Sequence, residues 1–223
     1  MNQKGKWRNF LLVFVFSGLD LLSGPWLLLQ LKTRGYRIIP PAHASEDPGL
    51  FLLQTILLSA YSVFLVLGCR AVLKERFGKA MGLSLKGSRL LVGGLVLFLA
   101  GVLGIGIRRT GDGLTMVLGF IYFVFAVGFT EEFLYRGLCV WLLKDFPWQV
   151  RYLLPNFIFA MLHIFAYNQF MPLNSGDVIR FMTSEMPVLM ASGCCLQILK
   201  DRTGTLWVPI LLHGALDFMS LFP

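Results

Sequence analysis

Three short segments in the second half of the chain place ionisable side chains among apolar residues. They read GFTEEFLYRGL from Gly128, FIFAMLHIF from Phe157 and LLHGALDF from Leu211. Their ionisable residues are Glu131, Glu132, Arg136, His163, His213 and Asp217. A carboxylate or an imidazole in a dry setting can act as a general base near neutral pH. The three segments therefore predict a site that moves protons, provided that the helices carrying them hold them together.

The spacing within the first segment divides its charges into two roles. Glu132 and Arg136 are four residues apart, so on an α-helix they share a face and can pair. Glu131 lies about 100° away around the helix, where it can act as a general base. The alternative is a structural ion pair beside a protonated glutamate, and the spacing alone leaves both interpretations open.

The other two segments repeat the four-residue spacing. Phe159 and His163 share one helix face, and His213 and Asp217 share another. Asp217 can orient the imidazole of His213 or stand beside it as a second polar group. The intervening Gly214 allows another helix to come close. Each histidine also has an alternative interpretation, as a core residue whose hydrogen bonds are satisfied locally.

The composition indicates that lipid surrounds this chain. Its 223 residues are 56% hydrophobic and 14% charged, whereas about 25% of the residues of a soluble domain are charged. The net charge of +8 could serve nucleic-acid binding or basic loops that face anionic headgroups. The basic residues cluster between apolar runs, which favours the membrane and argues against a nucleic-acid partner. The four cysteines form no CxxC pair, so they suggest neither a zinc site nor a disulfide framework.

The apolar runs predict an all-α fold, a polytopic transmembrane helical bundle. A spanning helix needs about 20 mainly apolar residues, and on that criterion we expect about seven spans, within a range of roughly six to eight. The predicted spans lie near 10–30, 50–69, 90–107, 115–143, 153–170, 178–199 and 205–222. We expect one integral membrane domain, 1–223, with a motif-bearing core at about 115–222. The fourth span is too long for one simple crossing, so we expect it to bend or to extend beyond the hydrocarbon.

The distribution of lysine and arginine predicts the orientation. One set of alternate loops holds most of the basic residues. The positive-inside rule therefore places the N-terminus in the cytoplasm and, with seven spans, the C-terminus outside. The segment 70–89 becomes a basic cytoplasmic stretch that lies against the headgroups. On this topology Glu131, His163 and His213 lie about 12–18 Å below the cytoplasmic surface, which predicts one polar cavity open to the cytoplasm.

The ordered set EExxxR, FxxxH and HxxxD across consecutive membrane helices resembles the CPBP family of intramembrane proteases, also called Abi. That family groups the type II CAAX prenyl endopeptidases with bacterial bacteriocin-processing and self-immunity proteins. The resemblance covers the C-terminal half, and the first half adds only hydrophobicity to it. It implies a multi-pass protein of the cell membrane that hydrolyses a peptide bond. The short termini favour a bacterial origin.

The resemblance also implies a role for each motif residue. Glu131 would activate a water for attack on a peptide carbonyl, with His163 as its partner in handling that water. His213 and Asp217 would stabilise the oxyanion or orient the site, and Asp217 stands where some members have Asn. The supporting residues would be Glu132, Arg136 and Phe159.

The cofactor and the substrate stay open. Glu131, His163 and His213 would suit zinc and leave a fourth position for water, but HExxH is absent and the family has also been viewed as metal-independent glutamate proteases. The cofactor is therefore either none or a divalent metal. The expected partners are the lipid bilayer and a peptide or membrane-protein substrate, prenylated or not. The alternative function is non-catalytic: a bacteriocin immunity factor that acts by binding, or a small proton-coupled transporter.

Overall fold

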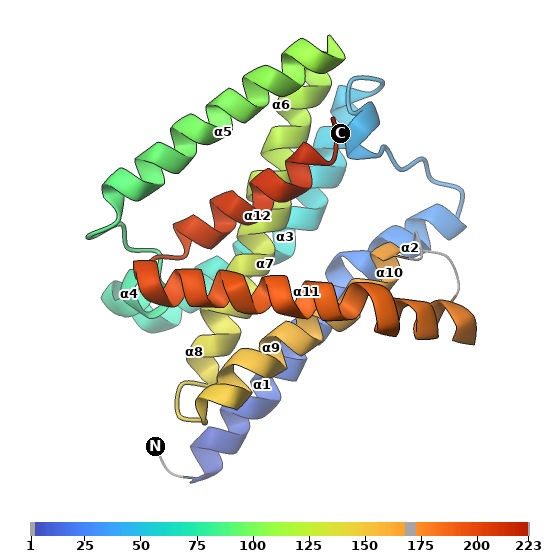
Figure 1. The fold of residues 1–223 in the computed structure, drawn as a ribbon. Coiled ribbons are helices and arrows are strands. Elements are labelled where there is room, and N and C mark those ends of the chain that lie inside the picture. Colours follow the sequence, from blue (N-terminus) through green and yellow to red (C-terminus); the bar gives the residue numbers. More distant parts are fainter. Residues whose placement is uncertain (1–2, 168–172, 223) are drawn as a thin grey trace. The chain divides into compact units, whose positions relative to one another are not determined.

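The structure, a computed structural model, describes residues 3–167 and 173–222, and every regular element in these ranges is a helix. The predicted all-α fold is confirmed. The elements are α1 (Gln3–Ser23), α2 (Pro25–Thr33), η1 (Pro41–His43), α3 (Pro48–Leu73), η2 (Lys74–Arg76), α4 (Phe77–Ala80), α5 (Arg89–Thr110), α6 (Gly113–Ile121), η3 (Tyr122–Gly128), α7 (Phe129–Glu131), η4 (Glu132–Cys139), α8 (Val140–Leu142), α9 (Trp148–Leu162), α10 (Ile164–Tyr167), α11 (Ser175–Thr203) and α12 (Trp207–Met219). Figure 1 shows them in sequence colours.

The chain divides into two compact units that interleave in the sequence. The first unit comprises Met1–Arg37 and Leu134–Ile198, and the second comprises Ile38–Phe133 and Leu199–Pro223. Each unit joins two segments that are separated in the sequence, so neither can form from one continuous stretch. The expectation of one membrane domain stays a prediction.

Four helical stretches in the described residues are long and apolar enough to cross a membrane. They are Gln3–Thr33, Pro48–Ala80, Arg89–Thr110 and Gly113–Leu142, and they coincide with the first four predicted spans. The fourth has 30 residues and would be about 45 Å long as an α-helix, which exceeds the hydrocarbon thickness of about 30 Å. Its predicted excess length is therefore confirmed.

The three later predicted spans have a different character. Helix α12 is apolar but has 13 residues, a length of about 20 Å. Helix α9 ends at Leu162, and residues 168–170, the end of the fifth predicted span, lie outside the described residues. Helix α11 has 29 residues, but its first half is polar and contains charged side chains, which is unfavourable for a membrane span. The count of seven spans stays a prediction.

The second unit is built around α12. This helix packs against α5, α6 and η3, and Figure 1 shows α12 beside the α6–α7 stretch. One buried cluster joins α12 to α5 and η3, and its members are Leu99, Val124, Leu211 and Ala215. A second joins Val102, Met116 and Phe218. The α12 residues of the two clusters, Leu211, Ala215 and Phe218, recur every three to four residues, so both clusters hold the same face of α12.

Two aspartates begin the helices that follow the loops of the second unit. The carboxylate of Asp47 accepts a hydrogen bond from the backbone N–H of Leu50 at 3.0 Å, and that of Asp112 accepts one from Thr115 at 2.9 Å. Such caps satisfy backbone donors that the first turn leaves without a helical partner. Asp112 also accepts a 2.7 Å hydrogen bond from the hydroxyl of Ser45. These bonds lower the pKa of the Asp112 carboxyl to about 2 and tie the loop before α3 to the start of α6.

In the first unit, α1 packs against α2, α8 and α9. The side-chain amide of Asn9 donates to the carbonyl of Leu142 at 3.4 Å. Near it, the aromatic rings of Trp7 and Phe10 both lie against Phe146. The start of the chain is therefore held against the loop that follows α8.

Candidate active site

The two glutamates lie in a continuous helical run whose hydrogen bonding changes along its length. The segments η3 and η4 are π-helical, and the short α7 separates them. In a π-helix the backbone hydrogen bonds run from i to i+5 instead of i to i+4, which changes the faces that side chains share, and such segments are frequent at functional sites. Glu131 is the last residue of α7, and Glu132 is the first of η4. The α-helical spacing used to assign their faces therefore does not apply downstream of Glu132.

Two glycines bring η3 and α12 into backbone contact. A Cβ atom added to Gly128 would lie 3.0 Å from the carbonyl oxygen of Ile210 and 3.1 Å from the backbone nitrogen of Gly214. A Cβ atom on Gly214 would lie 2.7 Å from the Cα atom of Val124. Small residues permit such close packing of membrane helices. The expectation that Gly214 allows close approach is thus confirmed, and the contact places the preceding residue, His213, beside the glutamates.

The imidazole of His213 lies among three carboxylates. Its Nδ1 atom is 2.8 Å from Oε1 of Glu132, and its Nε2 atom is 3.5 Å from both Oε2 of Glu131 and Oδ2 of Asp217. Each carboxylate is supplied by a different part of the second unit: α7, η4 and the next turn of α12. The helices of this unit therefore assemble four of the predicted site residues around one ring.

The three carboxylates differ in exposure. Glu132 is fully buried, whereas the side chain of Glu131 is 23% exposed and that of Asp217 is 36% exposed. In the neutral ring, the contact with Glu132 assigns the proton to Nδ1, which donates to the carboxylate. The Nε2 atom then carries the lone pair and faces the two carboxylates that are partly exposed. The Nε2 side of the ring is therefore more accessible than the Nδ1 side.

The sequence did not reveal the contact between Glu132 and His213. The spacing assigned Glu132 to support Arg136, which lies in the first unit, and that pairing stays a prediction. What the structure shows for Glu132 is a hydrogen-bonded histidine 81 residues further along the chain. Two adjacent glutamates in a sequence do not indicate which distant residue will contact them.

The first unit gathers the remaining motif residues around Phe159. The guanidinium of Arg136 lies over this ring, with its Cζ atom 4.2 Å from the centroid. The ring centroid of His163 lies 4.4 Å from that of Phe159, and its Nδ1 atom is 2.9 Å from the Phe159 carbonyl oxygen. The predicted common face of these two residues is confirmed. The role of His163 in the site stays a prediction.

One acidic residue outside the three motifs joins this cluster. The hydroxyl of Tyr135 donates to Oδ2 of Asp20 at 3.0 Å. The ring of Tyr135 is almost fully buried and packs edge-on against Phe159, with 5.4 Å between centroids. Asp20 is the one acidic residue in the first apolar run, and that isolation was the signal that could have found it.

The donor arrangement does not match a metal site. In the part of the chain that the structure describes, no group of three or more His, Cys, Asp or Glu side chains is placed to hold a metal ion. One nitrogen of His213 is already engaged by Glu132 at 2.8 Å. The set suggested for zinc also requires His163 from the first unit. A mechanism for this site therefore has to work with the protein side chains alone.

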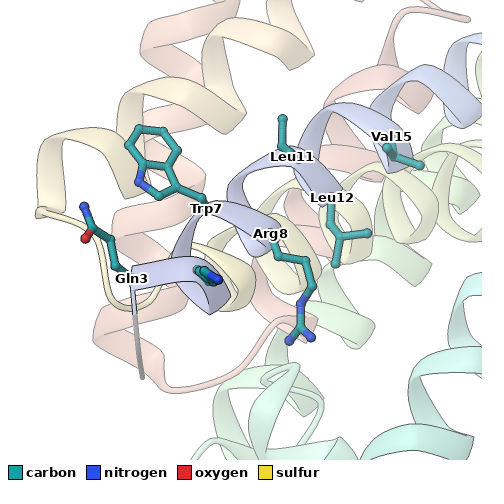
Figure 2. A pocket seen from close by; sticks show the side chains of 7 residues that line it. Gln3, Trp7, Arg8, Leu11, Leu12 and Val15 are labelled. Carbon is teal, nitrogen blue, oxygen red and sulfur yellow. The ribbon is translucent and has the colours of Figure 1, made fainter.

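Two open grooves lie away from the motif residues. One of them, of about 550 Å³, lies along α1. Figure 2 shows Trp7 and Arg8 nearer the start of the helix and Leu11, Leu12 and Val15 further along it. The second, of about 480 Å³, is lined by residues of α3, α6 and η3. No motif residue lines either groove, so neither is the candidate site.

Comparison with known proteins extends the argument from these contacts. Residues 113–219 match the family model described as "Type II CAAX prenyl endopeptidase Rce1-like". This range contains all three motifs and the three carboxylates that lie around His213. Searches of curated proteins and of solved structures found no match. Residues 113–219 of this chain are therefore an Rce1-like segment, and the resemblance to the CPBP family that the motifs predicted is confirmed.

Proposed function

We propose that this protein is an intramembrane endopeptidase of the CAAX type, in which Glu131 activates the attacking water. The observation that carries the proposal is the division of labour around His213: the buried Glu132 engages Nδ1, while the partly exposed Glu131 faces Nε2. The match of residues 113–219 to the Rce1-like model supports a membrane protease. The four candidate spans support a site within the bilayer.

Hydrolysis of a peptide bond needs a general base, a group that orients the attacking water and a group near the negative charge that develops on the carbonyl oxygen. Glu131 takes a proton from the water as its oxygen attacks the carbonyl carbon of the substrate. Nε2 of His213 accepts a hydrogen bond from the water and so holds it beside Glu131. When the carbon–nitrogen bond breaks, Glu131 returns the proton to the leaving amine. The products are an amine and a carboxylic acid, which then loses its proton to water, and Glu131 is regenerated as a carboxylate.

The residues around this centre act on its geometry. Glu132 fixes the tautomer and the orientation of His213, as a carboxylate does for many active-site histidines. Asp217 lies one helical turn from His213 and contacts the same nitrogen as Glu131. We assign it to orienting the site or to the oxyanion. His163 is assigned to the water, as the family resemblance implies.

The substrate is proposed to be a peptide or a membrane protein whose cleavable segment enters from the cytoplasm or from the lipid. Fully extended peptide presents its carbonyl groups without internal hydrogen bonds, and a polar cavity can receive such a segment where lipid cannot. The protein is placed in the cell membrane with its N-terminus in the cytoplasm. This orientation rests on the excess of basic residues in alternate loops.

The decisive experiment is a cleavage assay in membranes with a panel of CAAX-terminated peptides, prenylated and unprenylated. Glu131→Gln and His213→Ala should each abolish cleavage, because the first removes the base and the second removes the nitrogen that faces it. Glu185→Gln is the matched control, since Glu185 is an exposed glutamate of α11. Full cleavage by Glu131→Gln would refute the mechanism.

Two further arms separate the alternatives. A protein that protects cells equally well with Glu131 or Gln at this position would be a binding protein and not a peptidase. Proton flux that requires Glu131, in the absence of any cleavage, would instead identify a transporter. The chelator 1,10-phenanthroline should leave the rate unchanged, since no metal enters the steps above; inhibition reversed by added zinc would refute the metal-free mechanism.

A further inference from the structure

A strongly basic connection joins two of the candidate spans. Residues 70–89, here named the basic arm, link the stretch Pro48–Ala80 to the stretch Arg89–Thr110. The long α-helix of the first stretch, α3, has 26 residues and ends at Leu73. It is about 39 Å long, so its end extends beyond a hydrocarbon layer of about 30 Å. The arm must therefore lie at a membrane surface. Its charged residues are Arg70, Lys74, Arg76, Lys79, Lys86 and Arg89, with Glu75 as the single acid.

One side of the basic arm is bound to the start of α12. The backbone N–H of Leu206 donates to the carbonyl of Gly82 at 2.6 Å. The indole Nε1–H of Trp207 donates to the carbonyl of Leu83 at 3.0 Å. The two donors are Leu206, the residue before α12, and Trp207, the first residue of α12. The arm is therefore attached directly to the helix that carries His213.

Further contacts make this attachment specific. Met81 is fully buried. Gly82 has a φ of +76° and lies so close to Lys200 that a Cβ atom would be 3.1 Å from its Cε atom. The hydroxyl of Ser88 donates to the carbonyl of Thr203 at 3.2 Å. The inner side of the basic arm therefore packs against one defined surface, the end of α11 and the start of α12.

An aromatic stack continues from this attachment to the glutamates. The ring of Trp207 lies 6.1 Å from that of Phe129, which stacks on Phe133 at 5.8 Å. Phe133 in turn lies 6.1 Å from Phe77 of the arm. Phe129 and Phe133 flank Glu131 and Glu132 in the sequence. The arm therefore contacts both helical segments that form the site.

The other side of the basic arm faces outward. All six of its basic side chains are exposed. The large apolar side chains of Val72 and Leu85 stand exposed among them, at 79% and 40%. Mixed basic and apolar side chains at a membrane surface are typical of segments that bind anionic lipid. Exposed apolar side chains at this position favour lipid over an acidic peptide or a nucleic acid.

We propose that the basic arm binds anionic phospholipid headgroups, and that the bound lipid holds the start of α12, and with it His213, in place. The outer side supplies the charge that attracts the headgroups, and the attraction acts within a Debye length of about 10 Å. The inner side supplies the bonds that carry the effect to α12. The bound lipid would thus regulate the position of His213, whether or not the protein is a peptidase.

The binding half is tested by native mass spectrometry of the whole protein in detergent, titrated with phosphatidylglycerol or phosphatidylcholine. The arm variant is the triple substitution Arg76→Gln, Lys79→Gln and Lys86→Gln. The matched control is Lys32→Gln, Arg34→Gln and Arg37→Gln, which removes the same charge from three exposed residues of another loop. We expect the arm variant alone to bind phosphatidylglycerol at least about tenfold more weakly.

Three outcomes of the lipid titration would overturn the binding half. They are an equal loss in the control variant, equal binding of the neutral lipid, and full competition by millimolar glycerol phosphate. The last would indicate a site for a soluble phosphate instead of a lipid surface. Tighter binding of a soluble glutamate-rich peptide than of phosphatidylglycerol would refute it too, because the partner would then be acidic protein.

The coupling half is tested by amide hydrogen exchange at the start of α12. Phosphatidylglycerol should slow exchange across 204–213 in the parent and the control, and this slowing should be lost in the arm variant. Trp207→Phe removes the bond to Leu83, so it should bind the lipid as the parent does but lose most of the slowing. Unchanged exchange in the parent on lipid addition would refute the coupling. Neither readout uses cleavage, so the result stands apart from that of the peptidase assay.

Discussion

Nδ1 of His213 lies 2.8 Å from Oε1 of Glu132, and this contact gives the two adjacent glutamates different tasks. Glu132 is fully buried, so its carboxylate holds the ring and is shielded from any substrate. Glu131 remains 23% exposed on the other side of the same ring. A single imidazole thereby links a residue that orients with a residue that can react.

Replacing Glu132 should therefore impair turnover more than substrate binding. Glu132→Ala leaves Nδ1–H without its acceptor, and loss of such an orienting partner typically costs about 10–100-fold. We expect kcat to fall by that factor while KM changes little. Glu132→Gln keeps an acceptor oxygen and should recover part of the rate. Kinetics in membranes, with Glu185→Gln as the control, check this.

The pH profile distinguishes orientation from simple loss of structure. If Glu132 fixes the protonation of His213, Glu132→Gln should displace the pH–rate profile, whereas a misfolded fraction would lower the rate equally at every pH. An unchanged profile with a uniformly lowered rate would show that Glu132 serves only stability.

The close approach of η3 and α12 should make Gly214 intolerant of a methyl group. In Gly214→Ala the new Cβ atom would lie 2.7 Å from the Cα atom of Val124 and 2.9 Å from the carbonyl oxygen of Phe123. Both are backbone atoms, so α12 must shift, and overpacking of this kind costs about 1–3 kcal/mol. Thermal unfolding in detergent should show the loss.

Gly68→Ala is the matched control for this substitution. Gly68 lies in α3, where an added Cβ atom would meet nothing within 4 Å, and alanine favours a helix over glycine. It should leave the unfolding temperature unchanged or raise it. Equal destabilisation by both substitutions would show that the contact between Gly214 and Val124 is unimportant.

Much of the fold was predictable because a membrane restricts what a sequence can do. Runs of apolar residues indicated the first four spans to within a few residues at most ends, since lipid tolerates few charges across about 20 residues. The same rule identified Glu131, His213 and Asp217 as functional candidates, because ionisable residues in such surroundings are costly. These inferences needed only local composition.

The partners of those residues were harder to predict. The contact between Glu132 and His213 joins positions 81 residues apart, and no local spacing encodes it. The π-helical segments η3 and η4 also depart from the 3.6-residue repeat on which the assignment of faces relied. The span predicted near 205–222 corresponds to α12, which is shorter than a membrane span. Its apolar residues are buried by other helices of its own unit, so its apolar composition did not require a full crossing.

The bond between Asp20 and Tyr135 should contribute to the stability of the first unit. The hydroxyl of Tyr135 donates to a carboxylate at 3.0 Å, and hydrogen bonds to charged groups contribute about 1.5–3 kcal/mol. A double-mutant cycle with Tyr135→Phe and Asp20→Asn, read from unfolding in detergent, should give a coupling energy of about 1 kcal/mol or more. Additive effects of the two substitutions would refute a direct bond.

The loop bond at Asp112 should make stability depend on pH in the acid range. Its hydrogen bonds to Ser45 and Thr115 lower the pKa of this carboxyl from 3.8 to about 2. A lowered pKa means that the folded state favours the ionised form, so the contribution is complete above about pH 4 and is lost as the pH falls towards 2. The unfolding temperature of the parent should therefore decrease through this range.

Two substitutions isolate this contribution from the other carboxylates. Asp112→Asn cannot ionise, so its unfolding temperature should fall less steeply between pH 4 and pH 2 than that of the parent. Ser45→Ala removes the hydrogen bond that contributes most to the lowered pKa and should give an intermediate slope. Glu185→Gln, a change in an exposed residue of α11, should follow the parent. Parallel curves for the parent and Asp112→Asn would show that the capping bond contributes nothing, because the ionised carboxylate would then be no better held in the folded protein than in the unfolded chain.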